Sequence, residues 1–146
     1  MAKWKTKTGL PDAISRREIL AGSAKEKVDL GELGRRYLDA GWLSDAIDCF
    51  ERSHDTAKLE EVKRLAIEKD VFLLARLTRI EGFEVTPQDW RQAAEKALAD
   101  GRDRSAATAF DRAGDAAQAA AAREKIAALR AELKPPTRGR GGLDIA

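Results

Sequence analysis

Apolar residues along most of this chain recur every three or four positions, with polar residues between them. That spacing places the apolar side chains on one face of an α-helix. The pattern predicts a short helix at residues 12–20, four helices between residues 23 and 80, two between residues 86 and 114, and a long one at residues 116–133. Valine, threonine and aromatic residues are sparse, so an extended β-sheet is not expected.

Residues that start and stop helices stand at the ends of these segments. Thr86-Pro87 reads as an N-cap residue followed by the first helical residue. Ser23 with Glu26, and Asp29 with Glu32, both have the capping-box spacing, so the helix that ends before Gly41 starts at one or the other. We expect the fourth of these helices, residues 71–80, to be the more apolar and more buried one.

The two ends of the chain lack a helical period. Residues 1–11 are basic, and we interpret them as a flexible basic arm. Residues 135–146 are rich in Gly and Arg, and we expect a disordered tail there. Residues 12–134 then form one helical domain, which matches the size that a chain of 146 residues normally gives.

The chain repeats itself at an offset of 60 residues, with eight identities over residues 29–57 and no gap. The identical pairs are Asp29 and Asp89, Leu38 and Leu98, Gly41 and Gly101, Ala46 and Ala106, Phe50 and Phe110, Arg52 and Arg112, Asp55 and Asp115, and Ala57 and Ala117. The spacing of the Gly, Ala and Phe residues is the informative part, because alanine alone is common in this sequence.

The repeated segment resembles the tetratricopeptide repeat family. Leu33-Gly34-x2-Tyr37 and Ala46-x3-Phe50 match the family pattern, with Leu30 in the position of its tryptophan. In the later copy Trp90 fills that position, while alanines replace the Leu, Gly and Tyr. The middle unit lacks the glycines and the phenylalanine, so its packing as a true repeat stays open.

The resemblance implies an all-α, right-handed α-solenoid of about three antiparallel helix pairs with a C-terminal capping helix. Its units would be a first copy at 27–57, a degenerate middle pair at 58–85, a last copy at 87–115 and the capping helix at 116–133. In this register Gly34 lets a neighbouring helix come close. Ala46 and Ala106 sit where paired helices touch, and Phe50 and Phe110 fill the wedge between pairs.

Charge and cysteine content bear on the compartment in which the protein is expected to reside. The formal net charge is +2, but residues 1–28 carry seven Lys/Arg against three Asp/Glu, so the basic excess lies at the N-terminal end. A single cysteine, Cys49, excludes an intramolecular disulfide. No apolar run is long enough to span a bilayer, and no signal-peptide core follows the N-terminus. We therefore expect a cytoplasmic protein without membrane contact.

Catalytic chemistry is not expected. The one histidine, His54, has no nucleophile arranged beside it in the sequence, and a surface or helix-capping role is the simpler interpretation. Cys49 precedes Phe50 on a packed helix and is interpreted as a small buried hydrophobe. Residues 100–111 fail the spacing of a calcium loop. The sequence thus predicts no catalytic residues, no cofactor and no metal site.

Binding of another protein is the leading functional hypothesis. In the family resembled, the first helix of each pair lines a concave groove that binds peptides or partner domains. Carried over by register, the groove residues are Arg35, Asp39, Arg91 and Glu95. The function implied is that of a non-catalytic adaptor or scaffold. The oligomeric state is not predicted.

Two other functions stay open. A nucleic-acid- or ribosome-associated protein would use the basic ends, where Lys3-Trp4-Lys5 interleaves an aromatic ring with lysines and Arg138-Gly139-Arg140 adds a short Arg/Gly segment. Such contact is expected to be weak. A self-assembling structural module is the third hypothesis. Salt dependence separates nucleic-acid binding from protein binding, because phosphate contacts release counterions.

Overall fold

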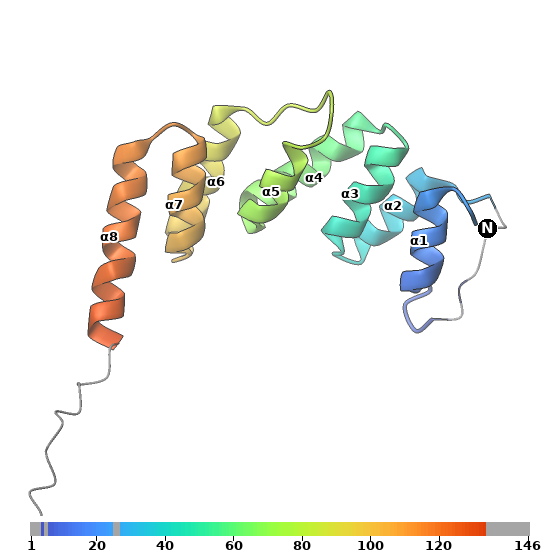
Figure 1. The fold of residues 1–146 in the computed structure, drawn as a ribbon, viewed down its shortest axis with the longest axis horizontal. Coiled ribbons are helices and arrows are strands. Elements are labelled where there is room, and N and C mark those ends of the chain that lie inside the picture. The colour runs from blue at the N-terminus through green and yellow to red at the C-terminus, as the bar shows by residue number, and fades with distance from the viewer. Residues whose placement is uncertain (1–3, 5, 25–26, 134–146) are drawn as a thin grey trace, which may run out of the picture.

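The computed structural model describes residues 4, 6–24 and 27–133, and within them the chain forms eight α-helices and no strand (Figure 1). The prediction of an all-α fold is confirmed for these residues. The helices are α1 (Ala13–Ala21), α2 (Leu30–Asp39), α3 (Leu43–Arg52), α4 (Thr56–Lys69), α5 (Val71–Leu77), α6 (Pro87–Ala99), α7 (Asp103–Arg112) and α8 (Ala116–Leu133). Residues 1–3, 5, 25–26 and 134–146 lie outside this description, and they include the whole of the predicted tail at 135–146.

Side-chain caps fix where the helices begin. Asp29 accepts a hydrogen bond from the backbone N–H of Glu32, which decides between the two predicted starts of α2 in favour of Asp29. Asp12 and Asp55 cap α1 and α4 in the same way. Thr86 caps α6 ahead of Pro87, as predicted, and together with Asp89 it forms a full capping box. Each cap satisfies backbone donors that the first turn of a helix leaves without partners.

The helices follow one another along an arc, with α1 at one end and α8 at the other (Figure 1). Helices α2 and α3 pack as a hairpin, and so do α6 and α7; α8 then packs against α7. Helix α4 lies between these groups and contacts α3, α5 and α6. The predicted boundary between residues 57 and 58 falls inside α4, because Asp55 starts that helix at Thr56.

One continuous apolar core runs the length of the arc, from Ile19 in α1 to Ala119 in α8. Phe50 and Phe110 are buried in it, as the sequence predicts. A Cβ atom built on Gly34 would lie 2.5 Å from Cε1 of Phe50 and 3.0 Å from Cβ of Cys49. This confirms that Gly34 allows α2 and α3 to approach closely, because any side chain there would clash with the ring.

Helix α5 differs from its prediction. It ends at Leu77 rather than at Ile80, and Phe72 on it is 76% exposed. The buried face of α5 is formed by Val71, Leu74 and Leu77, which share one side of the helix. Phe72 lies about 100° around the helix axis from Val71, so a helix this short cannot bury both residues against the same neighbours. The predicted end at Ile80 is therefore wrong, and the predicted burial holds for only one face of α5.

In the part of the predicted basic arm that the structure describes, residues 4 and 6–11, several side chains pack on the body. Leu10 and Pro11 are buried, and Trp4 is half-buried against the core. The hydroxyl of Thr6 donates a hydrogen bond of 2.5 Å to the carbonyl oxygen of Leu10, which closes the segment into a turn. Apolar side chains at residues 4 and 10 explain why this part of the chain lies on the body despite its lysines.

Candidate interaction surface

The four residues predicted to line a groove are all exposed, two on α2 and two on α6. On α2, Arg35 donates hydrogen bonds of 2.8 and 2.9 Å to the carboxylate of Glu32. This contact and the charge of Glu32 raise the pKa of Arg35 above its ordinary value. Among the described residues, Asp39 on α2 and Arg91 and Glu95 on α6 form no ion pair. Their charged groups are therefore available to a partner.

The two helices that carry these residues are separated in the fold. Helices α3, α4 and α5 stand between α2 and α6 along the arc (Figure 1). The structure thus places Arg35 with Asp39 near one end and Arg91 with Glu95 nearer the other, without contact between the two sets. On each helix an Arg precedes an acid by four residues, which is the less favourable order for an intrahelical pair. A shared groove formed by all four stays a prediction.

A set of arginines that the sequence did not single out links neighbouring helices. Arg76 of α5 donates to the carbonyl oxygen and the hydroxyl of Ser44, both at 2.7 Å, and pairs with Asp48 of α3. Arg16 of α1 pairs with Asp45 of α3, and Arg123 of α8 pairs with Asp111 of α7. These contacts join residues on different helices, so no local pattern reveals them. These charged groups are therefore already paired within the fold.

Arg102 has a different structural role at the C-terminal end of α4. Its guanidinium donates to the carbonyl oxygens of Lys69, at 3.1 Å, and Glu68, at 3.0 Å. The last carbonyls of a helix have no intrahelical donor, and positive charge is favourable there. Arg102 thus caps α4 from the turn before α7 and ties the middle of the arc to its C-terminal part.

Lys63 of α4 connects to α6 through a partly buried cluster. Its ammonium group lies 2.9 Å from Glu60, 3.2 Å from Asp89 and 5.7 Å from the centre of the Phe83 ring. Burial alone would lower the pKa of Lys63, but the two carboxylates outweigh it and the pKa is raised. The lysine stays charged and joins the capping box of α6 to α4.

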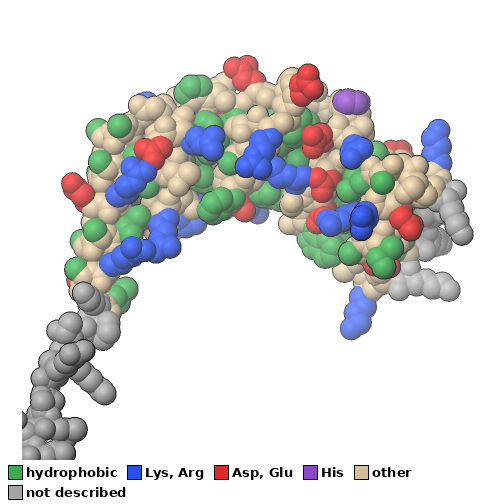
Figure 2. Space-filling model, in the orientation of Figure 1, with side chains coloured by type: hydrophobic (Ala, Val, Ile, Leu, Met, Phe, Trp, Pro, Cys, Tyr) green, Lys and Arg blue, Asp and Glu red, His purple; other side chains and the backbone are tan. Residues whose placement is uncertain are grey.

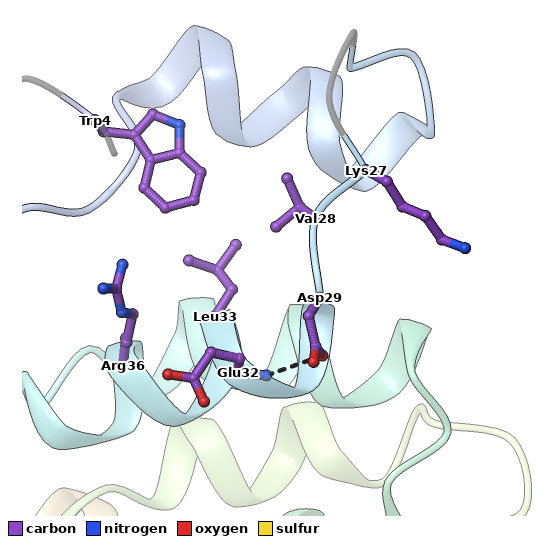
Figure 3. Close-up of a pocket in the computed structure, with 7 residues that line it drawn as sticks. All are labelled: Trp4, Lys27, Val28, Asp29, Glu32, Leu33 and Arg36. Atoms are coloured by element: carbon purple, nitrogen blue, oxygen red, sulfur yellow. Dashed lines mark hydrogen bonds between the residues drawn. The ribbon is translucent and has the colours of Figure 1, made fainter. Parts of the chain in front are cut away.

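A cavity of about 240 Å³ lies between the N-terminal segment and the start of α2 (Figure 3). Trp4, Val28 and Leu33 supply its apolar walls. Its charged residues are Lys27, Asp29, Glu32 and Arg36. Figure 3 shows the Trp4 ring on the opposite side of the cavity from α2. A space of this size fits a single side chain of a bound peptide rather than a cofactor, since small-molecule sites usually enclose about 300–1,000 Å³.

A second depression, of about 300 Å³, lies beside the exposed ring of Phe72. Glu51 of α3 and Ala75, Arg76, Arg79 and Ile80 line the rest of it. Lys and Arg side chains gather on this face of the molecule over α5, α7 and α8 (Figure 2). Sequence reasoning missed this depression, because the apolar composition of residues 71–80 predicts a more buried helix and does not indicate that Phe72 is exposed.

The residues weighed as catalytic candidates lie apart from these surfaces. Cys49 is fully buried, and burial, followed by the charge of Asp48, raises the pKa of its thiol to about 12. The thiol therefore stays protonated at neutral pH, consistent with the interpretation of Cys49 as a buried hydrophobe. His54 is exposed at the turn after α3 with a positive φ of 54°. Within residues 4, 6–24 and 27–133, no three His, Cys, Asp or Glu side chains are grouped to hold a metal ion.

Comparisons with other proteins add no identification. No protein family, curated protein or solved structure matches the chain. In the described ranges, no helix has both the length and the apolar character needed to cross a membrane.

Proposed function

We propose that this chain is a non-catalytic protein-interaction module, built as a tetratricopeptide-like solenoid of helix pairs with α8 as its capping helix. It would act as an adaptor or scaffold that holds a segment of a partner protein. The observation that carries the proposal is the equivalence of two helix pairs, α2 with α3 and α6 with α7.

The two helix pairs are alike in geometry as well as in sequence. Gly41 and Gly101 occupy the two turns with φ values of 79° and 74°. Ala46 and Ala106 are fully buried where the second helix meets the first, and Phe50 and Phe110 are buried one turn later. Repeated helix pairs that stack along an arc bury their apolar faces against one another and leave extended polar faces for binding. The arc in Figure 1 supports this arrangement.

The polar faces of the first helices support a protein partner. Each of these helices carries charges of both signs: Arg35 and Asp39 on α2, and Arg91 and Glu95 on α6. Mixed charges of this kind give direction to an extended peptide, because each charged group of the peptide finds its complement in only one orientation. We expect micromolar affinity, since the area offered is small and a flexible segment loses entropy on docking.

Affinity capture with charge-reversed protein tests the proposal. The full chain and the variant Arg35→Glu with Arg91→Glu would be used as bait in extract of the native organism, and captured proteins would be quantified by mass spectrometry. The matched control reverses Arg52 and Arg104 to Glu, two exposed residues on the second helices, α3 and α7. All four changes are on the surface, so thermal melting should move little.

We expect at least one protein to be captured by the parent and by the control and to be lost with Arg35→Glu and Arg91→Glu. That protein, purified, should then bind the parent directly in calorimetry. If every captured protein binds the groove variant and the control equally, the faces of α2 and α6 are not the binding site and the proposal fails.

The nucleic-acid alternative has less support from the contacts. Trp4, the ring expected to stack on a base, packs partly on the core beside α2. Gel shifts with single-stranded RNA at low and near-physiological salt test it. Binding that survives near-physiological salt would favour the alternative, because a few phosphate contacts lose affinity steeply as salt rises.

A further inference from the structure

The hydrogen bonds of residues 6–24, here called the N-terminal unit, stay within that segment. The hydroxyl of Thr6 donates to the carbonyl oxygen of Leu10, and the backbone N–H of Ser23 donates to the carbonyl oxygen of Glu18 at 2.9 Å. Among the described residues, no hydrogen bond joins the unit to α2 or to a later helix. The unit therefore depends on side-chain packing and on charge for its place on the body.

Buried apolar residues and one ion pair attach the unit to the body. Leu10 and Pro11 are buried before α1, and Ile19 is the buried residue of α1 itself. Arg16 of α1 pairs with Asp45 of α3, and both side chains stay partly open to solvent. Such a pair contributes little to stability, because water and salt screen it. The attachment thus rests mainly on a small apolar contact.

The packing of the unit is incomplete on the side of α2. Helix α1 contacts α3, whereas the cavity of about 240 Å³ lies between the N-terminal segment and α2 (Figure 3). Trp4, which precedes the unit, lies across this cavity from Leu33 of α2. Atoms that line a void have no contact partners on that side, so they lose the dispersion attraction of a close-packed interface. The unit is thus held mainly from the side of α3.

The inner helices are attached more firmly than this unit. Helix α6 buries four residues, which are Trp90, Ala93, Ala94 and Ala97. Lys63 of α4 also forms an ion pair with the capping box of α6. Parts of a protein with few buried apolar contacts open at a lower free energy than the core. The contacts of the N-terminal unit fit this description.

We propose that the N-terminal unit opens from the body as a whole while the helices from α2 onward stay folded. Leu10 and Ile19 anchor the closed state, and the ion pair of Arg16 with Asp45 helps to hold it closed. Because Trp4 precedes the unit, its ring moves away from α2 when the unit opens. The unit therefore controls the access of other molecules to the start of α2. The inference does not rest on the predicted groove residues, so the failure of either proposal leaves the other standing.

Hydrogen exchange of the full chain, followed for each amide by NMR at increasing low concentrations of urea, tests the opening. The hydrogen-bonded amides of α1 should share one protection factor, at least about tenfold below that of the slowest amides of α3 and α6. Their protection should also depend less on urea, because opening the unit exposes less surface than unfolding the chain. Equal protection in α1 and α3, or protection that falls gradually toward one end of α1, would overturn the inference.

A substitution far from the unit separates its opening from global unfolding. Ala106 is fully buried in α7, and Ala106→Gly should lower the protection of the slowest amides about fivefold, because glycine weakens a helix. The amides of α1 should keep their protection, since α7 stays folded when the unit opens. Circular dichroism checks that the variant is folded. An equal fall of protection in α1 and α6 would show that the chain opens only as a whole, which contradicts the inference.

Substitutions in the unit test the role of its ion pair. Arg16→Gln should lower the protection of the α1 amides about two- to fivefold, because it removes the pair with Asp45. The matched control is Arg17→Gln at the next, exposed residue, which should leave their protection unchanged. Asp45→Asn should act as Arg16→Gln does, and the two together should act no more strongly than one, because they break the same contact. Equal effects of Arg16→Gln and Arg17→Gln would refute the role of the ion pair in holding the unit closed.

Discussion

The two helix pairs related by the 60-residue offset, α2 with α3 and α6 with α7, share their turn glycines and buried phenylalanines but differ in their other core side chains. In the first pair, Tyr37, Ile47 and Cys49 are all fully buried. The corresponding residues of the second pair, 60 positions later, are Ala97, Ala107 and Ala109, which are also buried. The second pair has its bulk elsewhere: Trp90 is buried where the first pair has the half-buried Leu30.

The positions that stay the same are those where geometry allows few residues. Gly41 and Gly101 have a positive φ, which favours glycine, and Phe50 and Phe110 occupy equivalent buried sites. At other core positions, a larger residue in one pair corresponds to a smaller residue in the other. Packed interiors tolerate such changes when the total side-chain volume is kept. The repeat is therefore defined by its turn and its phenylalanine rather than by overall similarity.

The middle of the arc shows what happens without those residues. Between α4 and α5 the chain has no glycine turn; Asp70 in an extended conformation separates the two helices and caps α5. Polar contacts link the middle of the arc to the helices on either side. Lys63 bridges to α6, Arg76 to α3, and Arg102 caps α4. The middle pair is thus packed into the same apolar core as its neighbours and is also linked to them by charges and caps at its edges.

The largest expected effect is the loss of either phenylalanine. Phe50→Ala and Phe110→Ala should each lower the free energy of unfolding by about 3–5 kcal/mol, through lost burial and the cavity left behind. If the two pairs are equivalent, the two losses should be similar. Denaturant unfolding followed by circular dichroism measures both. A loss below about 1 kcal/mol at either position would break the equivalence.

The close contact at Gly34 should distinguish the first helix pair from the second. Gly34→Ala places a methyl group 2.5 Å from the Phe50 ring, so we expect a loss of about 1–3 kcal/mol in unfolding free energy despite the better helix propensity of alanine. Gly31→Ala on the same helix is the control, because its Cβ would meet only the Asp29 carboxylate at 3.3 Å. It should be neutral or stabilising. Equal effects of the two changes would mean that α2 and α3 are not in close contact.

The buried thiol of Cys49 predicts that the folded chain loses stability at alkaline pH. Burial raises the pKa of its thiol from 9.0 to about 12, so the unfolded chain loses this proton first as the pH rises. Stability should be complete below the unfolded pKa and fall between about pH 9 and 12, at up to about 1.4 kcal/mol per pH unit from this group. Cys49→Ala copies the Ala109 of the second pair and should reduce this decline. Urea unfolding at several alkaline pH values measures it; parallel curves would argue against a buried thiol.

The smallest effect is expected at the turn after α3. His54 has a φ of 54°, and the corresponding residue after α7 is Gly114 with a φ of 80°. His54→Gly relieves the strain of a left-handed side-chain-bearing residue, while glycine adds entropy to the unfolded chain. We expect the free energy of unfolding, measured by thermal denaturation, to rise by about 0.5–1 kcal/mol. Gly114→Ala should do the reverse, and a gain there would show that the two turns differ.

Much of this fold is predictable from the sequence because local rules act at helix ends. Asp55 and Thr86 mark helix starts by their capping chemistry, and the bounds of α8 follow from its composition and Pro135. The exposed ring of Phe72 was not predicted, because which face of a short helix is buried depends on distant neighbours. Leu10 likewise has a partner surface that only the tertiary fold supplies.

The candidate sites divide in the same way. The exposure of Arg35 and Arg91 on their helices follows from helical periodicity alone. The roles of Arg76 and Arg102 do not, because their contacts lie about thirty residues away in sequence. Local patterns thus predict which charges face outward, and tertiary contacts decide which of them remain available.

The most direct test of the central claim, that the two helix pairs together hold one partner, is calorimetry on single and combined charge reversals. The purified partner would be titrated into the parent, Arg35→Glu, Arg91→Glu and the double variant. We expect each single change to weaken binding about five- to tenfold and the double change to weaken it by about the product, since distant sites act independently. Unchanged affinity in all three variants would contradict the claim, and an effect confined to one arginine would limit the binding site to one helix pair.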